Sequence, residues 1–166
     1  EDLTLINKYS RIKFNPGDDW DHKFNNHFHD RIFFLVKVDN LLKAYGTLRE
    51  ITLLIDNRPY VVLGISGIAS IEERKGFGKI LMQAMVSYSK DYNKTIVGFC
   101  SKDKRGFYLK SGLKLKDHGE RYFIYRKEDG TEEVDVGDVI YYSSAENEVI
   151  KAIEADKKIF HLVPHW

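Results

Sequence analysis

The fold is decided by the stretch Ser66-Gly-Ile-Ala-Ser-Ile-Glu-Glu-Arg-Lys-Gly-Phe-Gly-Lys-Ile-Leu-Met-Gln-Ala-Met85. It begins as a β-type segment, passes through a turn that contains Gly76 and Gly78, and continues directly into an amphipathic helix. Such a turn gathers several free backbone N–H groups at a helix N-terminus, which suits a phosphate or pyrophosphate group. The stretch therefore predicts a strand–turn–helix unit of an α/β domain with an anion site at its turn.

Charged residues around the turn favour the same kind of ligand. Arg74, Lys75 and Lys79 add positive charge beside the helix dipole. The pattern is not a dinucleotide fingerprint, because Leu81 stands where the third glycine would fall. It is not a Walker loop either, because the sequence contains no G-K-[ST]. Taken alone, these residues leave open a plain strand-to-helix turn that binds no ligand.

Apolar periodicity and turn residues predict the elements on both sides of this stretch. Besides the main helix, which should end near Tyr92, helices are expected over residues 3–12, 21–28, 104–110 and 145–155. Strands are expected over residues 32–38, 44–55, 60–69, 95–100, 121–127, 134–142 and 158–163. This order predicts one α/β domain with a mixed sheet over residues 1–166. The first residue is Glu1 rather than methionine, which leaves room for an N-terminal strand upstream.

The same patterns predict how two parts of the chain pack. The main helix should bury one apolar face, which consists of Ile80, Leu81, Ala84, Met85 and Tyr88. The late strands over 134–142 and 158–163 are the candidates for exposed edges that pair across a two-fold axis in a homodimer.

Composition excludes several classes of protein. Of the 166 residues 43% are hydrophobic, and the 26 Lys and Arg nearly balance the 25 Asp and Glu, for a net charge of +1. This argues against a nucleic-acid binder and a polybasic membrane protein. Cys100 is the only cysteine, which excludes an intrachain disulfide and Cys-rich zinc motifs and fits a reducing cytosol. No apolar run approaches the ~20 residues that span a bilayer, and no signal peptide opens the chain, so a cytoplasmic location is expected.

A second block, Gly106-Phe-Tyr-Leu-Lys-Ser-Gly-Leu113, follows the glycine turn by about 30 residues. It predicts a short helix that carries Tyr108 and ends at Gly112. A tyrosine placed near a thioester sulfur can donate a proton to the departing thiolate. The alternative is that Tyr108 is a packing aromatic with a hydrogen-bonded hydroxyl.

Together the two blocks resemble the motifs of the GCN5-related N-acetyltransferase (GNAT) superfamily. Its pattern R/Q-x-x-G-x-G/A is similar to Glu73-Arg-Lys-Gly-Phe-Gly78, and its F-Y-x-x-x-G-F is similar to Phe107-Tyr-Leu-Lys-Ser-Gly-Leu113. Glu73 departs from the usual Arg or Gln, and the neighbouring Arg74 can supply the charge. The resemblance implies a mixed, centrally splayed β-sheet flanked by helices, with acetyl-CoA as cosubstrate and no metal.

The resemblance also implies roles for residues at matching positions. Backbone groups near the end of the strand would meet the acetyl carbonyl and the pantetheine arm, and backbone amides of the turn would hold the pyrophosphate. The cofactor-binding residues expected in this way are Ile68, Ala69, Ser70, Arg74, Lys75, Gly76, Phe77, Gly78 and Lys79. Tyr108 would be the general acid. Transfer to the amine would be direct, without an acyl-enzyme, which makes Cys100 a structural residue. The run 102–105 is expected to be a solvated helix start, with contact to the adenosine 3′-phosphate as the alternative.

A narrower resemblance points to the aminoglycoside 2′-N-acetyltransferase branch. It is carried by Trp20-Asp-His-Lys-Phe, Gly98-Phe-Cys-Ser101 and the terminal tryptophan, and it implies a small-molecule amine as acceptor, such as an aminoglycoside or a polyamine. The substrate-binding candidates are Asp18, Asp19, Asp21, Ser101 and Trp166. Two positions depart from that branch. Gly64 stands where it places a strand glutamate, and Pro164-His165 replace the acid before the last tryptophan.

The general base is the main gap in this interpretation, because an ammonium acceptor must lose a proton before it attacks. Glu50, on a central strand, is the first candidate, although it also fits the solvent face of a hairpin. His29, His118, the terminal carboxylate of Trp166 and an ordered water are the alternatives. His27 and His29 lack a third ligand for a metal and are expected to be surface histidines.

Three functions remain open from the sequence. The first is an enzyme that acetylates a small-molecule amine. The second is a non-catalytic module of the same fold that senses acyl-CoA, which the missing base and Gly64 favour. The third is a protein N-acetyltransferase, which needs a groove wide enough for a peptide.

Overall fold

The first half of the sheet is an antiparallel meander. The computed structural model describes residues 2–13, 31–134 and 137–162. In it β1 (Arg31–Val38), β2 (Leu41–Ile55) and β3 (Arg58–Ser70) follow one another. Two-residue turns join them, at Asp39-Asn40 and at Asp56-Asn57, and all four residues have positive φ. Asn and Asp tolerate this conformation, and turns of this kind match the right-handed twist of the flanking strands. The second turn is therefore tighter than the expected 56–59.

The remaining elements follow the order expected from the sequence, with β5 (Lys114–Lys116) as a strand that was not expected. Helix α1 precedes the meander, and three helices, two single 3-10 turns and six short strands follow it. Their bounds are α1 (Asp2–Lys13), α3 (Phe77–Asp91), β4 (Ile96–Cys100), η2 (Lys102–Lys104), α4 (Arg105–Lys110), β5 (Lys114–Lys116), η3 (Gly119–Arg121), β6 (Phe123–Arg126), β7 (Glu132–Val134), β8 (Asp138–Tyr142), α5 (Glu148–Glu154) and β9 (Ile159–His161). The helix expected over 21–28 lies outside the described residues.

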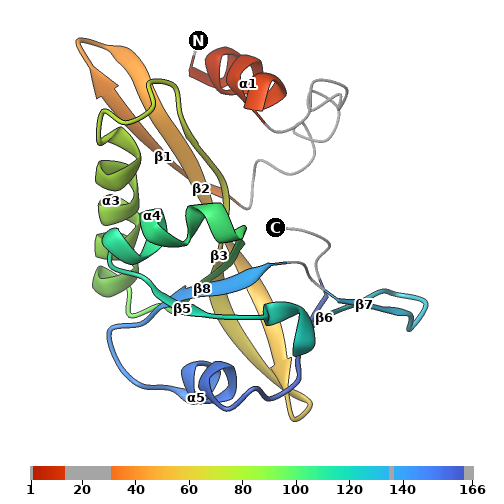
Figure 1. Ribbon diagram of the computed structural model, residues 1–166. Coiled ribbons are helices and arrows are strands. Elements are labelled where there is room, and N and C mark those ends of the chain that lie inside the picture. The colour runs from red at the N-terminus through yellow and green to blue at the C-terminus, as the bar shows by residue number, and fades with distance from the viewer. Residues whose placement is uncertain (1, 14–30, 135–136, 163–166) are drawn as a thin grey trace.

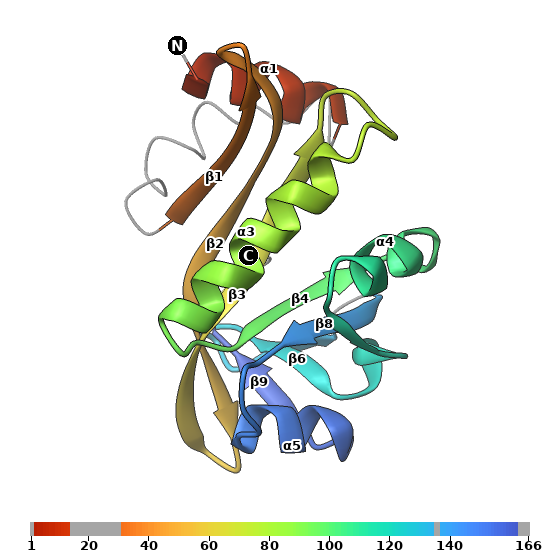
Figure 2. The ribbon, with the colours of Figure 1, turned by 90° about the vertical axis from the view of Figure 1, so that its left-hand side faces the viewer.

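The strands form one mixed sheet in the order β5-β8-β4-β3-β2-β9-β6-β7, with β1 also paired to β2. Helix α3 covers one face and packs on Leu48, Leu63 and Ile65. On the other face α1 packs near one end of β2, and α5 packs near the other end. Figure 1 and Figure 2 show this arrangement, with α1 and α5 far apart and α3 running along β2 and β3. The expected mixed sheet flanked by helices is confirmed.

The sheet is splayed at its centre. Strands β3 and β4 are parallel and pair only at Leu63 with Ile96 and at Gly64 with Val97. Beyond these residues β3 continues to Ser70 and β4 continues to Cys100, but the two strands no longer pair with each other. Helix α3 joins the two strands in the usual βαβ manner. The splay therefore opens between the strands that lead into and out of the glycine turn and its helix.

Helix α3 buries a different face from the one expected. The buried side chains are Leu81, Met82, Met85 and Ser89, whereas Ala84 is exposed and Ile80 is 52% exposed. Positions four apart stack on one helix face. The sheet contacts the stripe that runs through positions 81, 85 and 89, so residues one position earlier are turned about 100° away from it.

The expectation that the late strands have exposed edges is wrong. Strand β8 is paired on one side with β4 and on the other with β5, and β9 lies between β2 and β6. Both strands are interior to the sheet, so they offer no edge to a second copy. The outermost strands of the described sheet are β5 and β7. Strand β1 pairs with β2 off this main order. Homodimerisation remains a prediction, but β8 and β9 are not the strands that could pair across a two-fold axis.

Two late elements are shorter than expected for local reasons. Helix α5 begins at Glu148 because the Asn147 side chain accepts hydrogen bonds from the backbone N–H groups of Val149 and Ile150, both at 3.1 Å. This is an N-cap, which fixes where a helix begins. Strand β6 begins at Phe123 because the residues before it form η3.

Candidate active site

The glycine turn leaves the start of α3 open. Gly76 is the N-cap residue, with φ of 84°, and its side-chain-free position makes no cap hydrogen bond. Its carbonyl accepts the first intrahelical hydrogen bond, from Ile80 N at 3.1 Å. The first N–H groups of a helix have no intrahelical acceptor, and no acidic residue stands in the first turn of α3. Arg74 also has positive φ, of 60°, which curls the loop ahead of the helix. The turn thus has the backbone of an anion site.

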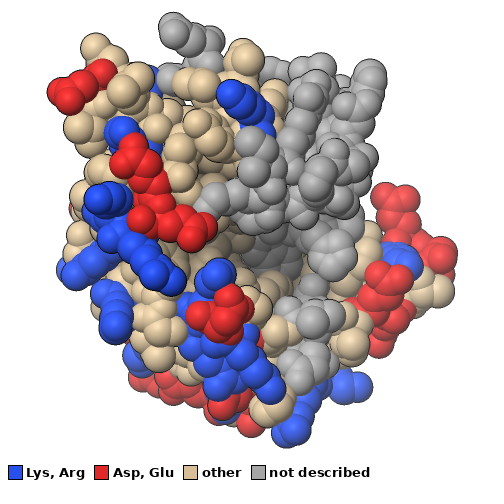
Figure 3. All heavy atoms as spheres, turned by 45° about the horizontal axis from the view of Figure 1, so that its top comes forward, with Lys and Arg blue, Asp and Glu red and all other residues tan. Residues whose placement is uncertain are grey.

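Charges around this turn are mixed in sign. Arg74, Lys75 and Lys79 are exposed, and Glu72 is held in an ion pair with Lys43 from β2. Figure 3 shows basic and acidic side chains interleaved on the face that it presents, rather than a field of one sign. Such a surface suits a compact anion held by backbone groups better than the backbone of a nucleic acid.

A β-bulge shapes β3 where the splay opens. The register with β2 passes from Tyr45 opposite Ala69 to Thr47 opposite Ser66, so two residues of β3, Gly67 and Ile68, lie opposite the single residue Gly46. Gly67 has φ of 62°, as the first residue of a glycine bulge requires. The bulge occurs beyond the last pair with β4, so this part of β3 is free of ladder pairing on its β4 side. The backbone at Ile68 therefore lies at the open part of the splay.

Gly46 lies opposite the bulge and close to α3. A Cβ atom at Gly46 would lie 2.5 Å from Ile68 Cδ1 and 2.8 Å from Met85 Cε, which are the ends of two flexible side chains. A larger residue at position 46 would therefore displace the side chains of Ile68 and Met85. The two other strand residues expected to meet the cofactor rejoin the ladder: Ala69 opposite Tyr45 and Ser70 opposite Ala44.

Tyr108 lies at the same end of α3 as the glycine turn. Helix α4 packs on the first turn of α3, and a Cβ atom at Gly78 would lie 3.1 Å from the Phe107 ring. Tyr108 is 9% exposed, and its ring packs edge to face on Phe107 at 4.9 Å between centroids. Burial raises the pKa of Tyr108 to about 12, with Cys100 adding to the effect. The two blocks of sequence that predicted the site are thus brought together.

Glu50 lies at the opposite end of α3. Its carboxylate pairs with Lys94 Nζ at 3.1 Å, and its side chain is 60% exposed. Lys94 follows the C-terminus of α3, whereas Tyr108 packs near the N-terminus, and a helix of 15 residues is about 22 Å long. The structure does not bring Glu50 to Tyr108. Its position is that of a hairpin residue on the solvent side of the sheet.

Comparison with solved structures identifies the fold. No family model and no curated protein matches the chain. One similar structure is the GNAT family N-acetyltransferase YhbS from Escherichia coli, which was solved with CoA. Its TM-score is 0.57 at 12% identity, and the match covers 92% of this chain and 79% of YhbS. Tetrahymena GCN5 has 0.56 at 12% identity and covers 86% of each chain. A probable N-acyltransferase from Enterococcus faecalis has 0.58 at 14% identity and covers 75% of this chain, which spans 35% of that protein's length.

The chain has the GNAT fold. The splay of β3 from β4, the open N-terminus of α3 and the placement of α4 are the features of this fold that the two motifs predicted. The likeness to the aminoglycoside branch remains a prediction. Within the GNAT fold the described residues contain no cluster of three or more His, Cys, Asp and Glu that could hold a metal ion. Among them there is also no helix with the length and apolar character needed to cross a membrane.

The remaining site candidates fall into two groups. Ser101 is exposed between β4 and η2, and its hydroxyl donates to Asp103 Oδ1 at 2.5 Å. His118 begins η3 with φ of 60°, and its backbone N–H donates to Asp138 Oδ1. The other candidates lie outside the described residues: Asp18, Asp19, Asp21, His27, His29 and Trp166.

Two features of the site were not predicted from the sequence. One is the bulge at Gly67, which an isolated glycine inside a strand pattern can signal. The other is an ion pair between Arg105 and Asp138 that joins α4 to β8. A single acid at the start of the apolar segment Asp138–Tyr142 was its only sequence signal, and its partner is 33 residues away along the chain.

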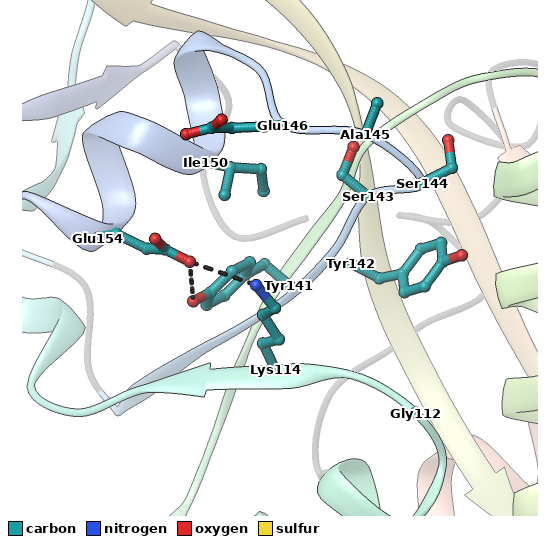
Figure 4. Close-up of a pocket in the computed structure, with 10 residues that line it drawn as sticks. All are labelled: Gly112, Lys114, Tyr141, Tyr142, Ser143, Ser144, Ala145, Glu146, Ile150 and Glu154. Carbon is teal, nitrogen blue, oxygen red and sulfur yellow. Dashed lines mark hydrogen bonds and ion pairs between the residues drawn. The ribbon is translucent and has the colours of Figure 1, made fainter.

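A pocket of about 340 Å³ lies apart from this site, between β5, the end of β8 and α5. In Figure 4 the Glu154 carboxylate joins Lys114 and the Tyr141 hydroxyl, which donates to it at 3.3 Å. Burial and the Glu154 charge raise the pKa of Tyr141 to about 12. The pocket borders Tyr142, which pairs with Ile96 at the closed end of the splay. None of the predicted site residues lines it.

Proposed function

We propose that this chain is an acetyl-CoA-dependent N-acetyltransferase that transfers acetyl directly to the primary amine of a small molecule. The observation that carries the proposal is the splay of β3 from β4, which opens between an uncapped helix N-terminus and a buried tyrosine. The fold comparison supports it, because two of the proteins with this fold were solved with CoA.

The residues of the turn fit the pyrophosphate of CoA. The N–H groups of Phe77, Gly78 and Lys79 belong to the first turn of α3, whose carbonyl partners are missing by geometry. A helix N-terminus carries about half a positive charge, which favours a phosphate. A φ of 84° is strained for any residue with a side chain, so position 76 of the loop requires glycine.

The unpaired edge of β3 fits the pantetheine arm. Between Gly64 and Ser70 this edge has no pairing with β4, so its polar backbone groups require another partner. An amide-bearing arm that lies along the edge supplies such partners in the manner of an added strand. The bulge at Gly67 sets where the arm ends and where the acyl carbonyl meets a backbone N–H.

The chemistry then follows from the placement of Tyr108. The amine nitrogen attacks the thioester carbonyl carbon and a C–N bond forms; the nitrogen then loses one proton to water as the C–S bond breaks. The departing sulfur takes a proton from the Tyr108 hydroxyl, which then regains one from solvent. Because the pKa of Tyr108 is about 12, the hydroxyl is protonated at neutral pH and serves as donor rather than base. Since Glu50 lies at the far end of α3, we assign deprotonation of the ammonium to water.

The acceptor approaches from the side of the sheet that α3 does not cover. Helix α3 packs on one face along β2 and β3, so a second substrate reaches the splay from the opposite face. The class of acceptor that we propose is a small amine of the aminoglycoside or polyamine kind. A reducing cytoplasm, where acetyl-CoA is made and Cys100 stays reduced, is the compartment that we propose.

Binding and turnover test the proposal in sequence. Isothermal titration with acetyl-CoA and with CoA should each show one binding site per chain. Dephospho-CoA is the comparison ligand. Mass spectrometry should then find an acetylated product in a panel of polyamines, aminoglycosides and peptide N-termini. No binding at high micromolar concentrations would refute the proposal.

Binding without product across that panel would favour a second function, a non-catalytic acyl-CoA sensor. The placement of Glu50 supports this alternative, because it removes the first candidate base from the site. Product from peptides alone would point to the protein N-acetyltransferase.

A further inference from the structure

Arg105, the first residue of α4, makes a two-point contact with Asp138, the first residue of β8. Its Nε lies 2.5 Å from Asp138 Oδ2 and its Nη2 lies 2.7 Å from Oδ1. This is the fork geometry that fixes direction as well as distance, which a lysine cannot reproduce. The Asp138 side chain is only 3% exposed, whereas that of Arg105 is 31% exposed. The contact is therefore a partly buried clamp between α4 and the sheet.

Two further contacts complete the clamp. The His118 backbone N–H donates to Asp138 Oδ1 at 3.2 Å, and Arg105 Nη2 lies 3.1 Å from Asp117 Oδ1. The carboxylate of Asp138 is thus held by the start of α4 and by the turn before η3. The Arg105 guanidinium and the His118 N–H hold the pKa of Asp138 below its ordinary value, so the carboxylate is ionised near neutral pH.

The Asp138 end of the clamp is fixed by the sheet. Asp138 pairs with Cys100, the last residue of β4, and the preceding Gly137 has φ of 108°. A Cβ atom at Gly137 would lie 2.7 Å from the Cys100 carbonyl oxygen, so the two strands approach as closely as a glycine allows. Because this end is held by strand pairing with β4, the clamp sets the position of Arg105 and of the helix that begins there.

Helix α4 depends on such anchors for its orientation. It has six residues, too few for a stable helix on its own. Phe107 packs on Gly78 of α3, and the Tyr108 carbonyl accepts from Leu113 N at 3.2 Å. Arg105 holds the other end of the helix, and Tyr108 follows it by one turn, on the same side of a helix.

We propose that the clamp between Arg105 and Asp138 is a positioning device that holds the Tyr108 hydroxyl at the sulfur of the departing thiolate. The proposal rests on the function proposed above, and it concerns one step of it. Arg105 makes its contacts with Asp138 and Asp117 rather than with Tyr108. It acts through α4, and a shift of the hydroxyl by about 1 Å is enough to lower turnover about 100-fold.

Variants of both partners test this role by turnover. Arg105→Gln removes the fork and should lower kcat about tenfold or more, with the KM for acetyl-CoA changed less than about twofold. Arg105→Lys keeps the charge and should lie between Arg105→Gln and the unaltered chain. The matched control is Arg126→Gln, which removes a half-buried arginine paired with Glu132 on the β6–β7 hairpin, away from α4, and should leave kcat unchanged.

A double-mutant cycle separates positioning from loss of structure. In the Tyr108→Phe background there is no hydroxyl to position, so Arg105→Gln should cause no further fall in kcat. An equal fall in both backgrounds, or a change in KM alone, would overturn the proposal. Asp138→Asn should reproduce the kcat effect. If that variant does not fold, the comparison of Arg105→Lys with Arg105→Gln still decides, since both keep the Asp138 carboxylate.

Hydrogen exchange keeps this proposal separate from the proposed function. In the unaltered chain and in Arg105→Gln the backbone amides of 108–113 report how firmly α4 is held, without any turnover. Exchange that is at least about tenfold faster in Arg105→Gln supports the clamp even if no amine is acetylated, and unchanged exchange refutes it. Absence of product from the unaltered chain with every amine refutes the enzyme instead.

Discussion

At the scale of single residues, the site is defined by two neighbouring groups that keep their protons. Burial raises the pKa of Tyr108 to about 12 and that of Cys100 to about 11. At pH 7 only about one Cys100 thiol in ten thousand is ionised, which is too few for an effective nucleophile. The hydroxyl, by contrast, needs its proton in order to donate it. The same buried environment therefore keeps the tyrosine protonated and disfavours the cysteine as acyl carrier.

Tyr108→Phe removes the proton donor and keeps the ring that packs on Phe107. We expect kcat to fall about 100-fold, because general acid catalysis contributes about that much, while the KM for acetyl-CoA changes little. Steady-state kinetics measure both. Tyr92→Phe is the matched control, since Tyr92 is 61% exposed at the other end of α3. Unchanged turnover in Tyr108→Phe would remove this residue from the mechanism.

Cys100→Ala tests whether the thiol takes part in the transfer. Direct transfer predicts that kcat stays within about twofold of the unaltered chain, because the thiol is neutral at working pH. Intact-protein mass spectrometry after mixing with acetyl-CoA should show no added acetyl group on either protein. An acetylated chain that disappears when amine is added would contradict direct transfer.

The raised pKa values also predict how stability depends on pH. In the folded chain Cys100 titrates near pH 11 instead of 9.0, so the unfolded chain loses this proton first as the pH rises. The stabilisation is complete below pH 9 and is lost between about pH 9 and 11. Urea unfolding at several pH values should show this fall in the free energy of unfolding. In Cys100→Ala the fall between pH 9 and 10 should be smaller. A fall of equal steepness in both proteins would count against this explanation.

At the scale of elements, the site depends on how closely α4 approaches α3. The approach is limited at Gly78, where an added Cβ would lie 3.1 Å from the Phe107 ring. Two motifs that are separate in the chain thus touch through their own signature residues. The glycine and the aromatic next to Tyr108 are one packing unit, and a change in either should move the other.

Gly78→Ala should push α4 away and lower kcat about tenfold, although alanine favours the helix. Phe107→Leu in the same chain makes room for the methyl group and should restore part of the loss. Gly106→Ala is the matched control, because no atom lies within 4 Å of a Cβ atom there and its φ is not positive. Kinetics and thermal unfolding of the four proteins measure the effect. If Phe107→Leu adds to the loss in Gly78→Ala, the contact is not the cause.

Local patterns predicted most of these elements, and their failures have local limits too. The strand–turn–helix unit was confirmed because turn chemistry and apolar period are short-range properties. The predicted buried face of α3 was wrong at Ile80, which is exposed. Packing against the sheet, rather than the apolar pattern of the helix, determines which side chains are buried. The late strands and β6 were found near their predicted places, but β5 was not expected, and no single strand showed which neighbours it would pair with.

At the scale of the whole molecule, the sheet has two parts that meet at only two residue pairs. One part contains β3 and its neighbours, and the other contains β4, β8 and β5. The core between α5 and the sheet joins them at the closed end of the splay. At the open end the strands diverge, and a ligand in the splay contacts both parts.

CoA should therefore stabilise the molecule at the open end of the splay. At 100 times its Kd a ligand that binds only the folded state adds about 2.7 kcal/mol to the free energy of unfolding. Hydrogen exchange with and without CoA should show protection at residues 65–70 and in the first turn of α3. The β6–β7 hairpin is the internal control and should not change. Protection spread evenly over the chain, or confined to the pocket beside α5, would place the ligand elsewhere.

By itself the sequence determined most of the elements of this protein, among them the glycine turn and the helix that carries Tyr108. Each depends on residues close in the chain: apolar period, glycine positions and capping side chains. Only the tertiary structure decided which of them meet. It placed Gly78 on Phe107 and Arg105 on Asp138, and it carried Glu50 to the far end of α3. The physical reason is that strand order and register arise from contacts between distant segments, and no local pattern encodes the distance between their side chains.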